Sequence, residues 1–521
     1  MGGFQRKKIF YTDFISLNAK WYPNKPAIVF GEDRLMWGEF NRRINRVANS
    51  LIKAGIKKGD NVAILSDNCR EYPEIMLGIV KAGAAIIPLS TMLQPDVITL
   101  ELEDMKPKAI FVGSSYLHCF EAYKERSNEI PLKNYILIDG KAEGHGRYEE
   151  FLNMASDEEP HIGLSYDDTY NIMLSSGTTG TPKGVVHTHY SRLFTALTLG
   201  LEFRIHNESV TIITTPFYTS GTPLVSLPTL LVCGTVVIMP KFDTKNFLEL
   251  VQREKGTHTF MVPTQFIRIM AHPEFSNYDT SSMEVMLCAA APLMKSTKLE
   301  ILQKFPNTKL VELYGVSEAI GTILRPDEQL SKIGSVGKSR MGGDIKIIDD
   351  MGRELPRGEI GEIVGGNVAI MKEYYKKPEK TKEAMWLDQE GREYVKTGDI
   401  GRFDEDGYLY ILDRKKDMII SGGINIFPND IEETIMRHPD VADAAVIGIP
   451  HKEWGETPLA LVVKKKGAAV VENKLKEWVN EQLAKYQRVS AVQFLNSIPR
   501  TDQGKALKRE LRERYGKNLE K

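Results

Sequence analysis

Residues 175–184 read SSGTTGTPKG and combine three glycines, five hydroxyl side chains and one lysine in one short loop. Glycine lets backbone N–H groups approach an anion closely, hydroxyl groups add donors, and Lys183 adds a positive charge, so this composition suits a phosphate. The preceding YNIML predicts a strand, which places the loop at the carboxyl end of a sheet strand, where α/β proteins bind ligands. An ordinary polar turn is the alternative interpretation.

The loop departs from the P-loop of NTPases. Pro182 stands where that motif requires glycine, and Gly184 follows Lys183 in place of serine or threonine. A P-loop NTPase is therefore excluded on spacing.

Four further stretches carry side chains that suit nucleotide chemistry. LYGVSEA at 313–319 contains Glu318, a hard oxygen ligand of the kind that Mg²⁺ takes beside phosphates. KTGDIG contains Asp399, a carboxylate suited to the paired hydroxyls of a ribose. LDRKKDMIISGG contributes Arg414 before a double glycine, and PRTDQGK contributes Lys505. Each stretch alone could be an exposed acid, a turn or a basic patch, but their order and spacing are far more specific.

Composition limits the other classes of function. The chain has 521 residues and a formal net charge of -1, which allows roughly two to four domains and gives no reason to expect a nucleic-acid partner. Its four cysteines are scattered, so we expect a reduced, cytoplasmic enzyme. Residues 209–240 lack charged side chains, but prolines and glycines divide them into strand, turn and short helix. We therefore expect buried core there and no integral membrane segment.

The elements that must position these motifs follow from hydrophobic periodicity. Residues 39–55 place apolar side chains on one helical face and end at Gly55, a plausible C-cap. Strands and helices alternate from NVAILSD to AIFVGS, which predicts parallel sheets covered by helices. The last hundred residues repeat this on a smaller scale, with a helix expected to start near Asn429, two strands, and a helix around Trp478. The predicted fold class is therefore α/β with a small α+β C-terminal domain.

In that order, SSGTTGTPKG, LYGVSEA, TGD, DRKKDMIISGG and PRTDQGK resemble the core motifs of the adenylate-forming superfamily, which includes acyl-CoA synthetases. The resemblance covers nearly the whole chain. It implies a large AMP-binding domain at 1–415 and a mobile C-terminal domain at 416–521, with a hinge at Lys416. It also implies two half-reactions, in which ATP and a carboxylate form an acyl-adenylate and coenzyme A then takes the acyl group.

The resemblance further implies roles for individual residues. Lys505 would bridge the carboxylate and the α-phosphate, and Glu318 with Thr178 would order Mg²⁺. The residues that would hold ATP or AMP are Ser175, Ser176, Gly177, Thr178, Thr179, Gly180, Lys183, Ala290, Ala291, Tyr314, Gly315, Ser317, Asp399 and Arg414. The coenzyme A path would include Gly422, Gly423, Trp454 and Arg488, with plain core as the less favoured alternative for Trp454.

The acyl pocket is the least determined part of the site. It is assigned to the tract TPFYTSGTP and to the residues after LYG, namely Tyr218, Thr219, Gly221 and Gly321. Many relatives carry a histidine or aromatic residue at the position of Thr219. The smaller threonine, together with the glycines, suggests room for an uncharged, mainly apolar acid of moderate size. No arginine or histidine stands out as a clamp for a second carboxylate.

Three classes of protein remain open. An acyl-CoA synthetase is favoured, because only sixteen residues follow Lys505 and leave no room for a fused carrier domain. A free-standing enzyme that loads a separate carrier protein is the runner-up, and a non-catalytic acyl-adenylate binding protein is disfavoured by the complete set of charged residues. A luciferase-like oxygenase lacks support. His187 and His189 follow the phosphate loop, but we expect no metal pair from them. Whether the enzyme forms a homodimer is left open.

Overall fold

The computed structural model describes residues 8–126, 130–153, 155–175, 183–318, 320–500 and 506–516. The chain divides into two compact units. The larger unit comprises Met1–Ser331, Ser339–Asp344 and Gly366–Met385, and the smaller comprises Lys332–Lys338, Ile345–Gly365 and Trp386–Lys521. The domain boundary expected between residues 415 and 416 stays a prediction. Among the described residues, no helix is both long and apolar enough to cross a membrane.

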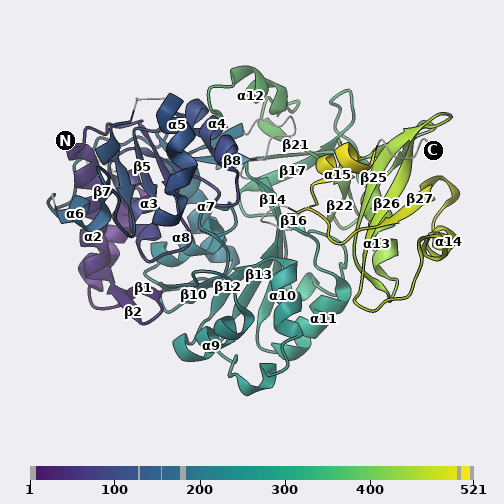
Figure 1. Ribbon diagram of the computed structural model, residues 1–521, viewed down its shortest axis with the longest axis horizontal. Helices are drawn as coiled ribbons and strands as arrows, with labels where there is room; N and C mark the ends of the chain where they lie inside the picture. Colours follow the sequence, from purple (N-terminus) through teal and green to yellow (C-terminus); the bar gives the residue numbers. More distant parts are fainter. Residues whose placement is uncertain are drawn as a thin grey trace. The chain divides into compact units, whose positions relative to one another are not determined.

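The first sheet of the larger unit contains the two strands that flank the predicted phosphate loop in the sequence, and Figure 1 shows the sheet. Its strand order is β19 (Glu373–Tyr374), β9 (Lys183–Thr188), β8 (Thr169–Ser175), β4 (Ala85–Pro88), β3 (Asn61–Leu65), β5 (Ala109–Val112), β6 (Tyr135–Leu137) and β7 (Gly146–Arg147). Strands β4 to β7 pair in parallel, whereas β8 with β9 and β9 with β19 are antiparallel. The parallel strands are those that the alternation of strand and helix predicts.

Helices cover both faces of this sheet. Val62 and Ile64 of β3 belong to the core shared with α2 (Trp37–Lys53) and α3 (Glu71–Lys81). Ala63 and Leu65 point to the other face, in a core with α4 (Pro95–Met105). The predicted helix at 39–55 is thus α2, which starts two residues earlier, and Gly55 follows its end with φ +93°.

The second sheet of the larger unit carries the LYGVSEA stretch. From β15 (Ile320–Leu324) its order is β14 (Lys309–Val316), β13 (Val285–Ala289), β12 (His258–Met261), β10 (Val210–Ile213), β11 (Thr235–Ile238), β1 (Pro26–Phe30) and β2 (Asp33–Met36). One face shares the core of α2 and α3 and is covered by α1 (Tyr11–Trp21), α7 (His189–Glu202) and α8 (Pro223–Leu231). The other face packs on α9 (Thr244–Glu254), α10 (Pro263–Met270) and α11 (Lys295–Lys304) (Figure 1). The uncharged segment 209–240 therefore forms β10, α8 and β11 of this core, as expected.

The smaller unit combines two mainly antiparallel sheets. One is built around β18 (Gly361–Asn367), β21 (Glu393–Phe403) and β22 (Leu409–Arg414). The other has the order β24 (Ile424–Ile426), β23 (Ile419–Ser421), β26 (Gly455–Lys464) and β25 (Val441–His451), and β27 (Ala491–Phe494) also pairs with β26.

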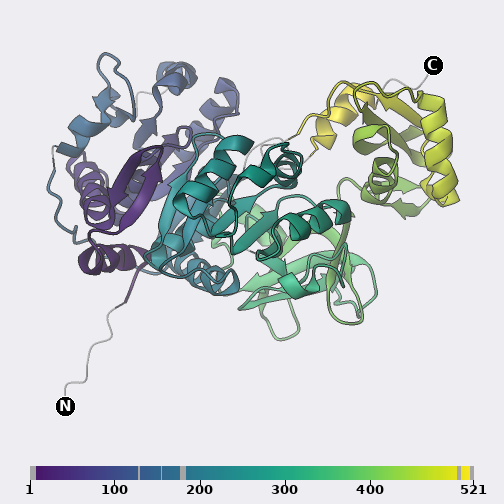
Figure 2. The same ribbon diagram turned by 90° about the horizontal axis from the view of Figure 1, so that it is seen from below.

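The C-terminal sheet is covered on both faces. Val446 and Val462 face α13 (Pro428–Met436) and α14 (Glu472–Gln482), whereas Ile447 and Leu461 face α15 (Lys508–Tyr515). Figure 2 shows these elements from below, in yellow-green and yellow. The predicted α/β fold with a small α+β C-terminal part is confirmed.

Candidate active site

The turn between β14 and β15 presents Ser317 and Glu318. The two strands pair through Val316 with Ile320 and through Gly315 with Gly321. A Cβ atom on Gly315 would lie 2.8 Å from the carbonyl oxygen of Ile320, and one on Gly321 would lie 2.7 Å from that of Tyr314. Glycine is therefore required at both positions for the strands to approach this closely.

Glu318 is half-buried and is held by a neutral donor. The phenol of Tyr374 donates a hydrogen bond to Oε1 of Glu318 at 2.6 Å, and the N–H of Met371 donates to the Glu318 carbonyl at 3.0 Å. Burial, and then the charge of Glu318, raise the pKa of Tyr374 far above its ordinary value, so Tyr374 stays a proton donor. Oε2 of Glu318 has no hydrogen-bond partner among the described residues.

Lys183 lies beside the same tyrosine. Its Nζ is 4.7 Å from the ring centroid of Tyr374, within cation–π range. Strand β19 brings Tyr374 there by pairing with β9, with Tyr374 opposite Val185. At Gly184 a Cβ atom would lie 2.6 Å from Cγ2 of Ile172, so the glycine allows this strand to pack closely.

The structure thus brings Lys183 and Glu318 together through Tyr374, which the sequence motifs did not indicate. Ser175 pairs with Lys183 across β8 and β9, which fixes the two ends of the phosphate loop. The loop residues Ser176, Gly177, Thr178, Thr179 and Gly180 lie outside the described residues, and so does Lys505.

The smaller unit holds the second carboxylate, Asp399. It lies opposite Arg414 in the β21–β22 pair, and the Arg414 Nε is 3.3 Å from Oδ1 of the buried Asp399. The Asp399 N–H donates to the hydroxyl of Thr397, which in turn donates to the carbonyl of Ile363. Gly398 between them has φ +72°, a conformation that favours glycine.

The predicted adenine residues are also neighbours in the structure. Ala290 and Ala291 follow the end of β13, and Tyr314 lies on β14, whose Leu313 pairs with Ala289. All three residues are half-buried. Ala290 has φ +77°, which a non-glycine residue rarely adopts and which is typical of functional sites.

The predicted acyl-pocket residues are buried in the larger unit. The Thr219 hydroxyl donates to the carbonyl of Pro216 at 2.8 Å, so it is already satisfied. A Cβ atom on Gly221 would lie 2.4 Å from the Phe260 ring. The expected room is therefore not present at the Cβ positions of Gly221 and Gly321, and Gly315 is equally close to its neighbours. These glycines serve close packing, and any acyl cavity must lie beside them.

The residues expected along the coenzyme A path are distributed over one end of the C-terminal sheet. Gly422 and Gly423 have φ +58° and +83°, and Cβ atoms on them would meet nothing within 4 Å. The Gly422 N–H donates to the Trp454 carbonyl, and the half-exposed Trp454 stacks on His451 with centroids 4.7 Å apart. Trp454 is thus not core. Arg488 is exposed. At the predicted hinge, burial lowers the pKa of Lys416.

The described residues contain no cluster of three or more His, Cys, Asp or Glu side chains suited to a metal. A single carboxylate such as Glu318 still suits Mg²⁺, which usually takes one or two carboxylates and completes its shell with phosphates and water. The neutral donor on Oε1 leaves the charge of Glu318 available to a cation.

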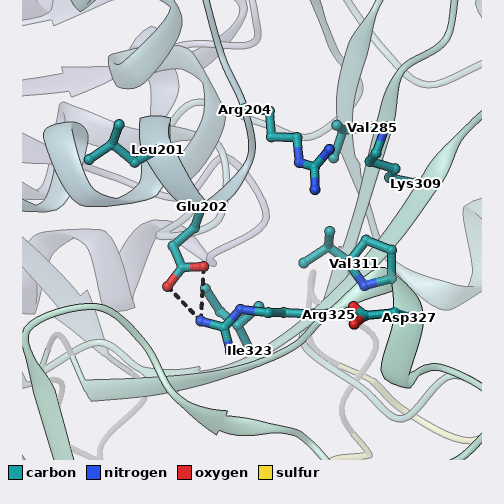
Figure 3. A pocket seen from close by; sticks show the side chains of 10 residues that line it. Leu201, Glu202, Arg204, Val285, Lys309, Val311, Ile323, Arg325 and Asp327 are labelled. Carbon is teal, nitrogen blue, oxygen red and sulfur yellow. Dashed lines mark hydrogen bonds and ion pairs between the residues drawn. The ribbon is translucent and has the colours of Figure 1, made fainter.

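A separate cavity of about 200 Å³ lies elsewhere in the larger unit (Figure 3). Its lining includes Val285 and Lys309, the first residues of β13 and β14, so it is at the opposite strand ends from Ala290 and Tyr314. Glu202 and Arg325 form two hydrogen bonds of 2.9 and 3.1 Å across it. This cavity is therefore distinct from the predicted nucleotide site.

Comparisons with known proteins agree with these motifs. Residues 16–375 match the family described as AMP-binding enzyme, and residues 430–505 match the AMP-binding enzyme C-terminal domain. A feruloyl-CoA synthase of Amycolatopsis sp is 33% identical over 501 residues, which cover 96% of this chain and 97% of the relative. A long-chain-fatty-acid–CoA ligase of Mycobacterium tuberculosis (strain CDC 1551 / Oshkosh) is 32% identical over 491 residues, or 94% of each chain.

Among solved structures, ATP-bound MatB of Rhodopseudomonas palustris superposes with a TM-score of 0.86 at 31% identity, covering 96% of this chain and 99% of its own. The chain belongs to the AMP-binding enzyme family, and the resemblance to the adenylate-forming superfamily is confirmed.

Proposed function

We propose that the chain joins an uncharged, mainly apolar carboxylic acid to coenzyme A, with ATP bound as its Mg²⁺ complex. The reaction class is that of the family: the chain is an ATP-dependent acyl-CoA synthetase, an acid–thiol ligase. The observation that carries the Mg²⁺ assignment is the geometry of Glu318, whose charge is held by a neutral phenol and whose Oε2 has no partner among the described residues.

The chemistry requires these charges. In the first half-reaction a carboxylate oxygen attacks the α-phosphorus of ATP, the bond to the β-phosphate oxygen breaks, and pyrophosphate leaves. Two anions must meet, so positioned cations supply most of the stabilisation of the transition state. Mg²⁺, when bound, neutralises phosphate charge and orients the leaving group. Glu318 would hold it, Lys183 would face the pyrophosphate, and Lys505 would bridge the two reacting anions.

Asp399 and Arg414 fit the ribose. A buried carboxylate accepts hydrogen bonds from two neighbouring hydroxyls, and Arg414 keeps its charge tolerable in that buried position. Tyr314 with Ala290 and Ala291 would line the adenine. These roles rest on the family resemblance and on the proximity of Tyr314 in β14 to the two alanines that follow β13.

In the second half-reaction the sulfur of coenzyme A attacks the acyl carbonyl and AMP leaves. By resemblance, Lys416 is the hinge, and Gly422, Gly423, Trp454 and Arg488 lie along the coenzyme A path. The open space around both glycines supports this assignment. A carrier-protein thiol is the alternative acceptor, but the relatives named above are CoA ligases. Cytoplasmic location and a possible dimer stay predictions.

Two observations favour an apolar acid. The residues assigned to the pocket, Tyr218, Thr219, Gly221 and Gly321, are all uncharged, and the hydroxyl of Thr219 is engaged internally. The relatives are named for feruloyl, long-chain fatty and 4-coumarate substrates, all of which have one carboxylate on a mainly apolar body.

A screen of pyrophosphate release over fatty, alicyclic, aromatic and dicarboxylic acids, with and without coenzyme A, tests the proposal. We expect the highest kcat/KM with a monocarboxylic acid and full turnover only with coenzyme A present. Preference for a dicarboxylic acid, or turnover with a carrier protein alone, would refute it.

A further inference from the structure

A chain of buried hydrogen bonds ends at the turn that presents Glu318. His187 of β9 donates from Nε2 to the Ser317 carbonyl at 2.8 Å. Arg192 of α7 donates to Nδ1 of the same ring at 3.0 Å, and its Nε donates to the side chain of Asn171 on β8 at 2.7 Å. His187, Arg192 and Asn171 are all buried.

The partners determine which ring nitrogen carries the proton. A guanidinium can only donate, so Nδ1 must be the acceptor and the proton must be on Nε2. The Ser317 carbonyl can only accept, which requires the same tautomer. The partners of both ring nitrogens therefore require the tautomer with its proton on Nε2, and the imidazole is neutral. Burial, and secondly the charge of Arg192, hold the pKa of His187 well below its ordinary value.

The hydrogen bond from His187 acts on the turn that carries Glu318. The Ser317 carbonyl precedes Glu318, the Glu318 carbonyl accepts from Met371, and its carboxylate accepts from Tyr374. If His187 is lost, the half-buried Ser317 carbonyl loses its donor, and the turn is free to rotate to find another. The position of the carboxylate would change with it.

We propose that His187, with its tautomer set by Arg192 and Asn171, is a positioning residue that holds the Glu318 turn in the orientation required for Mg²⁺. It touches neither metal nor nucleotide in this role. The inference rests on the proposed role of Glu318 and deepens it. It also gives His187 a function other than the metal pair that its spacing to His189 fails to support.

The chain offers a matched control. His258 of β12 is also buried, and its Nε2 donates to the Phe203 carbonyl at 3.1 Å, while Nδ1 contacts the Thr257 hydroxyl. His258→Leu therefore removes the same kind of bond at the opposite strand end of the sheet from the turn. Arg192→Met removes the donor to Nδ1, whereas Arg192→Lys keeps a cationic donor of similar length.

Calorimetric titration with ATP, in Mg²⁺ and in EDTA, tests the proposal without an acyl substrate. We expect His187→Leu to weaken Mg²⁺-dependent ATP binding roughly 5-fold or more, the lower end of the range for an unpaired acceptor, because the Ser317 carbonyl is half-buried. Binding in EDTA should stay within about twofold of the original protein, as should both measurements on His258→Leu. Arg192→Met should resemble His187→Leu, and Arg192→Lys should restore most of the affinity.

Glu318→Gln distinguishes a failure of the proposed metal role of Glu318 from a failure of the proposed positioning role of His187. If it leaves Mg²⁺-dependent binding unchanged, the proposed role of Glu318 is wrong, and the role of His187 falls with it. If it weakens that binding while His187→Leu does not, only the positioning inference is overturned. An equal loss in His187→Leu and His258→Leu also overturns it, because a general loss of folding explains both.

Nitrogen-15 spectra of the histidine rings report which nitrogen of His187 is protonated, and a change in stability alone would not alter that result. In the original protein His187 should show a protonated Nε2 and an unprotonated Nδ1 from pH 5.5 to 8.5, whereas Arg192→Met, which leaves Nδ1 without its donor, should make protonation of Nδ1 detectable at the acidic end of that range. A protonated Nδ1 or an imidazolium in the original protein overturns the assignment.

Discussion

Two carboxylates, Glu318 in the larger unit and Asp399 in the smaller, are held in opposite ways. Glu318 accepts from the neutral phenol of Tyr374 at 2.6 Å. Asp399 lies 3.3 Å from the guanidinium of Arg414, across one pair of strands. Both are at least half-buried, so their difference lies in the charge of the partner.

The charge of its partner indicates which ligand each of the two carboxylates can bind. A carboxylate that accepts from a neutral donor keeps its charge for a cation, whereas a carboxylate beside a guanidinium is partly neutralised. The second arrangement still leaves lone pairs for hydroxyl donors. The contrast therefore supports a metal role for Glu318 and a ribose role for Asp399.

The largest effect is expected for Lys505→Ala, which removes a charge proposed to act only during adenylation. We expect adenylate formation to fall at least ~10³-fold, since the loss of one positioned charge contact costs several kcal/mol. Thioester formation from supplied acyl-adenylate should persist. Rates of the two half-reactions, measured separately, check this. Equal losses in both would show that Lys505 has no role specific to adenylation.

Glu318→Gln keeps the shape of the side chain and removes its charge. We expect adenylation to fall roughly 10²- to 10³-fold and the Mg²⁺ requirement to rise, because an amide is a poor ligand for this ion. The exposed neighbour of Tyr374, Glu373, supplies the control Glu373→Gln, which should leave the Mg²⁺ titration of pyrophosphate release unchanged. An unchanged Mg²⁺ titration in Glu318→Gln would contradict the proposed metal role of Glu318.

Asp399→Asn should act on the nucleotide and not on the metal. An asparagine can accept one hydroxyl but loses the charge-assisted bond, so we expect KM for ATP to rise about 10- to 30-fold with an unchanged Mg²⁺ midpoint. Asp404→Asn, which breaks an ion pair with Lys332 in the same unit, is the control. A shifted Mg²⁺ midpoint in Asp399→Asn would mean that the two carboxylates are not specialised.

Tyr374→Phe tests the neutral donor itself. Loss of one hydrogen bond to a carboxylate should lower the adenylation rate about 10-fold and weaken Mg²⁺ binding, because Glu318 then loses its orientation. Tyr375→Phe removes the hydroxyl of the next residue, which accepts from Asn61, and should leave both quantities unchanged. If the two variants behave alike, Tyr374 contributes to packing only.

The sequence was sufficient to predict the α/β fold class and helix α2, whereas the roles of the motif residues stay predictions. Helix α2 follows from its apolar period, and Asp399 and Arg414 are recognised from local motifs and become neighbours through one hairpin. Local pattern is enough in these cases because the partners are close in the chain.

Long-range partners could not be predicted in this way. Tyr374 is 56 residues from Glu318, and His187 is 130 residues from Ser317, so no periodicity or motif joins them. Gly221 shows the same limit, since it suggested open space until the ring of Phe260 was found there. Register between distant strands decides these contacts, and a single sequence does not display that register.

A third carboxylate, Glu101 on α4, has neither a neutral donor nor a cation as partner among the residues that the structure describes. It is buried, and its Oε2 has no hydrogen-bond partner among the described residues. Burial alone raises its pKa to about 8. Between its ordinary pKa and pH 8 the folded protein therefore holds a proton that the unfolded chain has lost, so the free energy of unfolding must fall as pH rises through that window.

Glu101→Gln should remove this pH dependence while leaving catalysis unchanged, because an amide is neutral at every pH. At about 1.4 kcal/mol for each unit of pKa, we expect the variant to exceed the original protein in free energy of unfolding by several kcal/mol at pH 9, and to differ little at pH 4.5. Urea denaturation between pH 4.5 and 9 measures this. Glu103→Gln, on the same helix but half-exposed beside Arg126, should shift stability by less than about 0.5 kcal/mol throughout. Parallel pH profiles for the original protein and Glu101→Gln would show that Glu101 is charged in the fold, and that an unpartnered buried carboxylate does not behave differently from the two that are held.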